Sequence, residues 1–466
     1  MLSSWKPASG KMPAPLPGHE AFERRRRALS AKFPGETLVI PTGHEKVRAN
    51  DTHYRFRPSS DFYYLTGNVE PDGVLLMIPR ASKRGVAKGH EDILFVEPNP
   101  GRSSATFYTD RNKGELWVGP RLGIKESQAR FRVQRCEGLH ELPGYLQTAA
   151  QSGKSRVLRG YAGKVDRVLP TKGNEKRDAE LGATLSEMRL LKDATEIREL
   201  SRVIASTKRG FEDVIRSLGK ARTERVVEGV FGLRARVEGN DVGYGTIAAA
   251  GHHACTLHWT RNDGPLVQGE LLLLDAGVEG DSLYTADITR TLPISGTFSR
   301  EQRIIHDLVH RAQAAALAEV KPGNDFLEPN RAAMRVLAEG LADLGILTVS
   351  AEDALRDENQ FYKRYSLHNV SHMLGLDVHD CAQARQETYK FGKLEPGMVL
   401  TVEPGLYFQR DDLTVPPKFR GIGVRIEDDV VVTKKGCQNL SADIPSTSDA
   451  VEAWMAGLIG KPSELA

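Results

Sequence analysis

The chain has 466 residues, of which 40% are hydrophobic and 27% are charged, and its formal net charge is +3. This mix is ordinary for a folded globular protein, and the length allows two or three domains with sizeable cores. Because 64 basic residues face 61 acidic ones, bulk charge does not favour nucleic acid or an anionic membrane as a partner. The four cysteines form no CxxC pair, which is typical of reduced thiols rather than of a zinc or redox motif.

The first part of the chain predicts an arm followed by an α/β domain. Residues 1–18 are rich in proline and are expected to form a flexible arm without the apolar core of a signal peptide. A helix is expected near 19–33, with its arginine run at 24–27 on a solvated face or in salt bridges between subunits. Short buried strands are expected at 37–41, 74–79 and 93–96, and the alternation with helices predicts an α/β domain over 19–184.

The second part of the chain has a different pattern. The polar stretch 169–180 is expected to be a loop or linker, so we place a domain boundary near residue 185. Helices are expected from Asp193 or Thr195 to 218 and over 223–238. Further on, strand-like runs lie at 246–250, 271–275, 287–293, 399–403 and 423–433, with helices at 299–320 and 326–344. This order predicts an α+β domain with a largely antiparallel sheet over 185–466.

Two aspartates emerge from strands that are expected to be buried. Asp275 ends a run of four leucines, and a buried carboxylate without a partner would be costly or would become neutral. Asp287 follows after a turn signal around 279–282, so a hairpin would place the two acids side by side on one face. Like charges in that position repel each other unless a cation lies between them.

The same pattern recurs near the end of the chain. Glu403 ends an apolar strand, and Arg425 and Glu427 are two residues apart in another, which places them on one face. His368 and His372 have the spacing of the zinc-binding HExxH motif, but position 369 is Asn, so the general base of that motif is missing.

Acids and a histidine in this pattern indicate a metal site. Four acids supply more negative charge than one divalent ion needs, so two ions that share carboxylates would balance the charge. Oxygen ligands favour Mn²⁺, Mg²⁺ or Ca²⁺, and one imidazole shifts the preference toward a transition ion such as Mn²⁺, Co²⁺ or Zn²⁺. Two such ions can activate a water and polarise a carbonyl or phosphoryl oxygen, so the residues predict a metallohydrolase and leave its substrate open.

Five segments in order resemble Xaa-Pro aminopeptidases, within the prolidase, creatinase and methionine aminopeptidase group that is called the pita-bread family. They are Asp275-Ala-Gly277, Thr285-Ala-Asp-Ile-Thr-Arg-Thr291, Ser371-His-Met-Leu-Gly-Leu-Asp-Val-His-Asp380, Leu400-Thr-Val-Glu-Pro-Gly-Leu-Tyr407 and Gly423-Val-Arg-Ile-Glu-Asp-Asp429. Residues 57–67 and 115–119 are similar to segments of the creatinase-like N-terminal domain. The resemblance therefore implies an α/β creatinase-like domain before an α+β pita-bread catalytic domain.

The resemblance also implies roles for individual residues. Two divalent ions, most readily Mn²⁺, would be held by Asp275, Asp287, His372, Glu403 and Glu427, with Asp287 and Glu427 bridging them. His258, His379 and Arg425 would be catalytic together with Glu403, whereas His368, Tyr407 and Asp61 would bind substrate. The spacing from Asp275 to Asp287 is one residue longer than the commonest family spacing, and the extra residue falls in the turn at 279–284.

The implied reaction removes the N-terminal residue from a peptide whose second residue is proline. An activated water would attack the scissile carbonyl, Glu403 would move its proton, and His258 would stabilise the developing oxyanion. His379 would position the carbonyl or the proline, and Arg425 would orient Glu427 or else neutralise Asp428 or Asp429.

Two other functions remain open at this point. A prolidase would accept only Xaa-Pro dipeptides, and a non-catalytic module of the same fold would bind peptides without cleaving them. The expected partners are peptides with an Xaa-Pro N-terminus, with no nucleic acid and no membrane. The expected assembly is a homodimer or homotetramer in the cytoplasm.

Overall fold

The computed structural model describes residues 4–5, 11–80, 89–169 and 171–462. The chain divides into two compact units, Met1–Leu185 and Ser186–Ala466, and each unit is described by itself below. Within the described residues, no helix combines the length and the apolarity needed to cross a bilayer.

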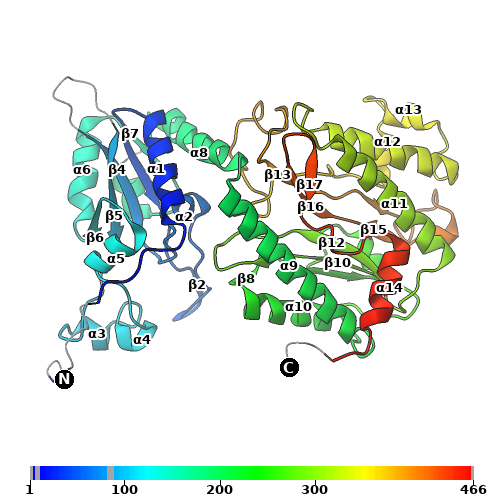
Figure 1. Cartoon of the computed structure of the whole chain (residues 1–466), viewed down its shortest axis with the longest axis horizontal. Coiled ribbons are helices and arrows are strands. Elements are labelled where there is room, and N and C mark those ends of the chain that lie inside the picture. The colour runs from blue at the N-terminus through cyan, green and yellow to red at the C-terminus, as the bar shows by residue number, and fades with distance from the viewer. Residues whose placement is uncertain (1–3, 6–10, 81–88, 170, 463–466) are drawn as a thin grey trace. The chain divides into compact units, whose positions relative to one another are not determined.

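The N-terminal unit is built on a mixed five-stranded sheet in the order β6-β5-β4-β1-β7 (Figure 1). The strands are β1 (Thr37–Pro41), β4 (Val74–Pro79), β5 (His90–Val96), β6 (Arg135–Gly138) and β7 (Ser155–Val157). Strand β4 is antiparallel to both neighbours, whereas β6 and β7 pair in parallel at the two edges. All three strands expected from the sequence form.

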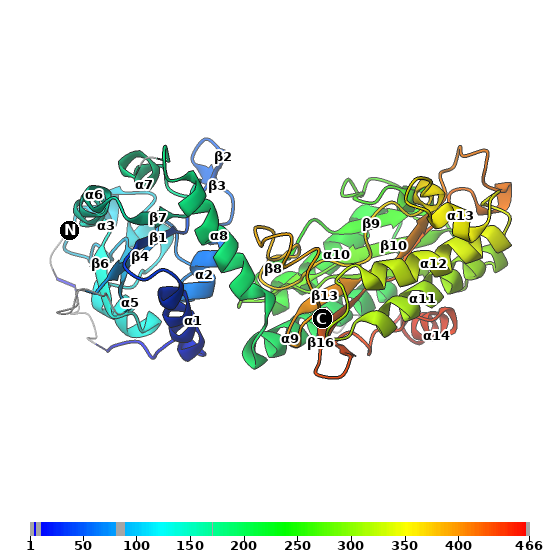
Figure 2. The same cartoon turned by 90° about the horizontal axis from the view of Figure 1, so that it is seen from above.

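Helices cover both faces of this sheet. Figures 1 and 2 show α1 (His19–Lys32) and α6 (Leu142–Ser152) on opposite sides of it. Alternate residues such as Val39 and Leu76 pack against α6 and α7 (Gly163–Val168). The smaller elements of this unit are β2 (Val47–Ala49), β3 (Thr52–His53), α2 (Ser60–Thr66), α3 (Thr106–Thr109), α4 (Glu115–Val118) and α5 (Ile124–Phe131).

One expectation for this unit is wrong in part. Arg24 and Arg27 are exposed as expected, but Arg25 and Arg26 are buried, and Arg26 pairs with Asp92 at 2.7 Å. Arg26 also donates to two backbone carbonyls, so its guanidinium is bound by acceptors inside the fold.

The arm at 1–18 lies partly outside the described residues. Its described end is held where the Leu16 amide donates to the carbonyl of Arg130.

Three long helices follow β7 in the sequence and precede β8. The stretch that was expected to be a loop contains the start of α8 (Glu175–Leu190), so that prediction is wrong beyond residue 174. Helix α9 (Ala194–Ser217) begins with a capping box in which Asp193 and Glu196 satisfy each other's backbone amides. Helix α10 (Glu224–Glu238) follows directly and ends at Gly239, as expected.

The C-terminal unit contains two antiparallel three-stranded sheets and smaller ladders. Their strands are β8 (Asp241–Val242), β9 (Ile247–Ala250), β10 (Leu271–Ala276), β11 (Val278–Glu279), β12 (Ile288–Pro293), β13 (Val399–Val402), β14 (Gly405–Tyr407), β15 (Gly423–Arg425), β16 (Asp428–Val432) and β17 (Cys437–Asn439). The run 423–433 is not one strand: it breaks at residues 426–427, so β15 pairs with β14 while β16 pairs with β13. A bridge between Thr289 and Glu427 links the two sheets.

Each sheet of this unit has its own helical layer. Helices α9, α10 and α14 (Ser448–Leu458) pack against β10 and β12, whereas α11 (Arg300–Glu319) and α12 (Glu328–Asp343) pack against β13 to β16. A short helix, α13 (Ala351–Leu355), follows α12. Along β10, Leu272 and Leu274 face the α9 layer, whereas Leu273 packs with Tyr407. Side chains alternate along a strand, so Asp275 points to the same side as Leu273.

Candidate active site

A cavity of about 490 Å³ collects most of the residues that the sequence singled out. It lies within the C-terminal unit and is lined by Tyr244, Gly245, Ile247, Leu257, His258, Thr260, Asp275, Asp287, His368, His372, Val378, His379, Glu403, Arg425 and Glu427. All five predicted metal ligands are therefore in one place, together with four of the remaining predicted site residues.

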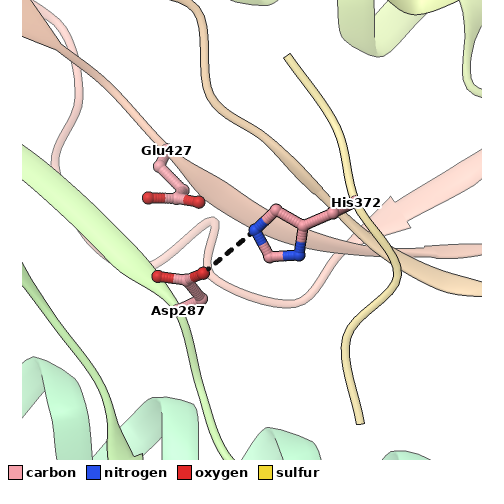
Figure 3. A group of neighbouring side chains, drawn as sticks. All are labelled: Asp287, His372 and Glu427. Atoms are coloured by element: carbon pink, nitrogen blue, oxygen red, sulfur yellow. Dashed lines mark ion pairs between the residues drawn. The ribbon is translucent and has the colours of Figure 1, made fainter. Parts of the chain in front are cut away.

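The centre of the cavity is a group of three side chains, Asp287, His372 and Glu427 (Figure 3). One ligand atom of each lies within 4.8 Å of the others, and the Nε2 atom of His372 is 3.3 Å from a carboxylate oxygen of Asp287. Asp287 directly precedes β12, and Glu427 lies at the break between β15 and β16. Strand ends from both sheets thus deliver acids to the same point.

Asp275 and Glu403 extend this group. Asp275 is near the end of β10, and Glu403 directly follows β13, with an oxygen 3.5 Å from Nε2 of His372. The hairpin register differs from the expectation, since Asp275 is opposite Thr289 and Asp287 lies outside the paired residues. The hydroxyl of Tyr244 joins the two aspartates instead: it lies 2.7 Å from Asp275 and 2.5 Å from Asp287.

The carboxylates of this group are buried close together, so a nearby positive charge would stabilise their ionised forms. Burial raises the pKa values of Asp275 and Glu427, and repulsion from Asp287 raises them further. Burial likewise raises the pKa of Glu403, to about 7. For His372, burial lowers the pKa, but Asp287 and Glu403 outweigh that effect and raise it to about 9. The group combines several carboxylate oxygens, which are negatively charged, with one imidazole. This set of ligands fits divalent transition ions.

Arg425 has a different partner from the one expected. Its guanidinium lies 2.5 Å from Asp275 and donates to the Tyr407 hydroxyl at 3.0 Å. It also donates to the Thr289 hydroxyl at 3.2 Å, so it reaches Glu427 only through Thr289. A carboxylate oxygen of Glu427 accepts instead from the hydroxyl of Thr289 at 2.6 Å.

Arg425 does not neutralise Asp428 or Asp429 either. Asp428 pairs at 2.7 Å with Arg290, a fully buried residue that also donates to the carbonyl of Glu427. Asp429 accepts from the backbone amide of Asp287 at 3.1 Å. Both interactions brace the backbone around the two central acids.

The remaining histidines surround the carboxylates. A nitrogen of His368 lies 2.8 Å from the Tyr407 hydroxyl, and burial together with Arg425 lowers the pKa of His368 to about 4. His379 lies edge-on to His372, with 4.5 Å between ring centroids, and burial together with His372 lowers its pKa. His258 lines the cavity from the loop after β9. In the neutral form that their lowered pKa values favour, His368 and His379 can each donate one hydrogen bond and accept another.

Three polar residues that stabilise this site were not predicted from the sequence. Tyr244 bridges two acids, Thr289 binds Glu427, and Arg290 ties the chain around Glu427 and Asp428. Thr289 and Arg290 stand two and three positions after Asp287 in a strand whose residues are all buried, so polar residues in a run that was predicted to be a strand were the signal. Tyr244 lies between two glycines, and nothing in the local pattern marks it.

The longer turn between the two aspartates is well defined. Leu283 adopts a left-handed conformation, with φ of 61°, and its amide donates to the carbonyl of Gly280. Ser282 and Tyr284 donate to Glu199 and Glu196 of α9, each at 2.7 Å. A left-handed residue and two hydrogen bonds to α9 therefore fix the conformation of this turn.

Asp61 belongs to the other unit. It lies on α2, where it is 5% exposed. Its part in substrate binding stays a prediction.

Four carboxylates and a histidine that converge from two sheets define the class: this is a metallohydrolase site on an antiparallel α+β scaffold. Residues 198–434 match the metallopeptidase family M24, and residues 22–158 match the N-terminal domain of aminopeptidase P. The chain belongs to the M24 metallopeptidases and carries the aminopeptidase P N-terminal domain. Divalent metal ions are accordingly its cofactor class.

Similar proteins agree with this assignment. The chain is 51% identical over 462 residues to Xaa-Pro aminopeptidase 1 of Streptomyces coelicolor, covering 99% of this chain and 92% of that protein. It is 33% identical to Xaa-Pro aminopeptidase of Escherichia coli, covering 94% and 97% of the two chains. The low-pH form of E. coli aminopeptidase P superimposes with a TM-score of 0.83 at 32% identity, covering 95% and 99%. These matches confirm the predicted fold class, an α/β domain before a pita-bread catalytic domain.

Proposed function

We propose that this protein is a metal-dependent aminopeptidase that releases the N-terminal residue from peptides with proline at the second position. The proposal depends above all on one observation: the five residues that match the family's ligand set all line one buried cavity. Relatives named Xaa-Pro aminopeptidase, which cover nearly the whole chain, support the same activity.

In this proposal two divalent ions would be held by Asp275, Asp287, His372, Glu403 and Glu427. Mn²⁺ is the proposed ion, and Co²⁺ and Zn²⁺ are the alternatives, because the donors are mainly oxygen with one imidazole. When bound, such ions lower the pKa of a water molecule and polarise a carbonyl oxygen.

The chain's own residues then handle protons and position the substrate. Glu403 accepts a proton from the attacking water and passes it to the leaving nitrogen, which in an Xaa-Pro bond belongs to proline. His258 donates a hydrogen bond to the oxyanion as it develops. His379 orients the scissile carbonyl. Arg425 keeps Asp275 in place, since the two side chains lie 2.5 Å apart.

Substrate binding is assigned to His368, Tyr407 and Asp61. Tyr407 receives a hydrogen bond from Arg425 and lies 2.8 Å from a nitrogen of His368, so His368, which lines the cavity, is held by a connected set of side chains. Proline has no N–H and a fixed φ, and a shaped wall can select it where backbone hydrogen bonding cannot. Asp61 is retained as a further substrate-binding candidate from the N-terminal unit.

The decisive experiment compares three peptides that differ in one feature each. The purified protein is freed of metal, supplied with Mn²⁺, Co²⁺ or Zn²⁺ in turn, and assayed with Xaa-Pro, Xaa-Pro-Xaa and the matched Xaa-Ala-Xaa. Cleavage of Xaa-Pro-Xaa but not of Xaa-Ala-Xaa is expected. Cleavage confined to the dipeptide would identify a prolidase instead.

The same preparation tests whether the protein is catalytic at all. A chain that retains no divalent ion and cleaves no peptide with any of the three metals would be a peptide-binding module. We further propose a homodimer or homotetramer in the cytoplasm, which sedimentation and fractionation of cells can test.

A further inference from the structure

Glu224 is a buried carboxylate that the reaction outlined above does not use. It is the first residue of α10 and is 0% exposed. One of its oxygens accepts from the Ala250 amide at 2.7 Å and lies 2.8 Å from Nδ1 of His253. The other accepts from the Trp259 indole at 2.9 Å and the Gly264 amide at 2.6 Å. A carboxylate offers about four acceptor positions, so these four nitrogens use all of them.

All four nitrogens belong to a single segment, residues 250–264. Glu224 also donates its own backbone amide to the carbonyl of Gly264 at 3.0 Å, which closes the segment against the start of α10. The ring of His253 stacks on Trp259 with 3.9 Å between centroids and 22° between planes. The segment is therefore gathered around one carboxylate.

This segment carries His258. Leu257, His258 and Thr260 line the active-site cavity, whereas the indole of Trp259 reaches back to Glu224. Within the described chain, the ring of His258 has no hydrogen bond or ion pair that would hold it. Its position therefore depends on the backbone on either side of it.

A second buried side chain holds the far end of the segment. Asn262 is fully buried with φ of 47°; its oxygen accepts from the Ala248 amide, and its nitrogen donates to the carbonyl of Thr246, both at 2.9 Å. Asn262 ties the segment to β9, whereas Glu224 ties it to α10. Glu224 is the only one of the two that binds the residue adjacent to His258.

We propose that Glu224 is a positioning residue for the reaction: its carboxylate fixes the 250–264 loop so that His258 meets the developing oxyanion. This inference rests on the proposed function. Glu224 touches neither the cavity nor the predicted metal ligands, so it acts through His258 and leaves metal binding unchanged.

A double-mutant cycle between Glu224→Gln and His258→Ala tests this directly. Glutamine keeps the size of the side chain but turns an NH₂ group toward two N–H donors. We expect kcat to fall by about 100-fold, as for a small misplacement of a catalytic group, with KM changed less than about 3-fold. In the His258→Ala background, the same change should lower kcat by less than about 3-fold, because the two residues act as one unit.

Asp213→Asn is the matched control. Asp213 is a carboxylate 2% exposed that binds Arg234 at the other end of α10, at 2.7 Å. Its substitution should lower thermal stability, and any effect on kcat should be equal with and without His258. Metal content should equal that of the wild type in all variants.

Two further measurements keep the inference open to refutation. Hydrogen exchange of the metal-free protein should accelerate in residues 250–264 of the Glu224→Gln variant but not in β10. If that variant does not fold, Trp259→Phe, which removes one donor and keeps a ring against His253, enters the same cycle.

An unchanged kcat, or an equal loss with and without His258, would overturn the inference. A wild-type protein that cleaves no proline peptide would instead refute the proposed function.

Discussion

The acids of the active site come from strands, whereas its histidines come from loops. Asp275 lies in β10, and Asp287, Glu403 and Glu427 each lie directly next to a strand. Strand pairing fixes the backbone at or beside these positions, and Tyr244 and Thr289 then hold the carboxylate side chains by hydrogen bonds. The carboxylates, which repel one another, thus lie where strand pairing holds the backbone.

The loops reach similar order by another route. Each of the loops that carry His258 and His379 is tied down by a buried carboxylate, Glu224 in one case and Asp380 in the other. Asp380 is 1% exposed and lies 3.1 Å from the ammonium of Lys192. Residues that handle protons can therefore be carried by loops, provided that a buried carboxylate holds the loop in place of strand pairing.

The largest effect is expected from removing an acid of the sheet. Asp287→Ala should lower kcat by more than about 10³-fold, beyond the loss caused by one oxyanion donor, because metal binding fails as well. Steady-state kinetics and metal analysis measure this. The exposed Asp281 in the neighbouring turn is the control, and its alanine variant should keep full activity. If the Asp287→Ala variant retained its metal, Asp287 would not be a required metal ligand.

The pH dependence of the metal-free protein comes next. Folding raises the pKa of Glu403 from 4.5 to about 7 and that of His372 from 6.5 to about 9. Folding lowers the pKa of His368 from 6.5 to about 4, so its effect on stability opposes that of Glu403 below pH 6.5. Between pH 6.5 and about 9 the raised pKa of His372 makes the folded state bind more protons than the unfolded state, so stability falls as pH rises. Thermal unfolding of the metal-free protein should show a Tm that decreases over this range. Mn²⁺ should reduce the slope; a Tm that rises would contradict the repulsion.

A smaller effect is expected at Tyr244, which supports the strand acids from a loop. Tyr244→Phe removes the hydroxyl between Asp275 and Asp287 and should weaken metal affinity by about 10-fold, the lower end for residues that support ligands. Titration against a competing chelator measures it. Tyr284→Phe, whose hydroxyl binds Glu196 instead, should leave metal affinity unchanged.

The smallest effect is expected at the turn that holds the extra residue. Ser282→Ala removes a hydrogen bond to Glu199 and should lower the free energy of unfolding by about 1 kcal/mol. Because the strands set the acids, kcat should stay at the wild-type value. Chemical denaturation and kinetics on the same sample decide; a change in kcat would mean that the turn also positions Asp287.

Sequence patterns predicted the strand-borne part of the site well, because a carboxylate after a buried apolar run has few explanations. Asp275 and Glu403 follow such runs, and both reach the cavity. Sequence patterns also predicted the long helices α9 to α12 and the strands β10, β12 and β13, since the periodicity of apolar residues reports burial directly.

Pairing partners could not be predicted in this way. Spacing placed Arg425 and Glu427 on one face, but the strand breaks between them and Arg425 pairs with Asp275, far away in the sequence. Arg26 was likewise misjudged, because a run of charges does not show which member meets a buried acid. Such contacts depend on tertiary packing, which a linear pattern does not contain.

Arg290 has a consequence for the order in which the molecule is assembled. Its guanidinium reaches the carbonyls of Ile444 and Pro445 as well as Asp428, and it is fully buried. A buried arginine cannot remain without these acceptors, so the strand after Asp287 settles only once residues 444–445 have been synthesised. Metal capture on the ribosome should therefore be a late event, close to completion of the chain.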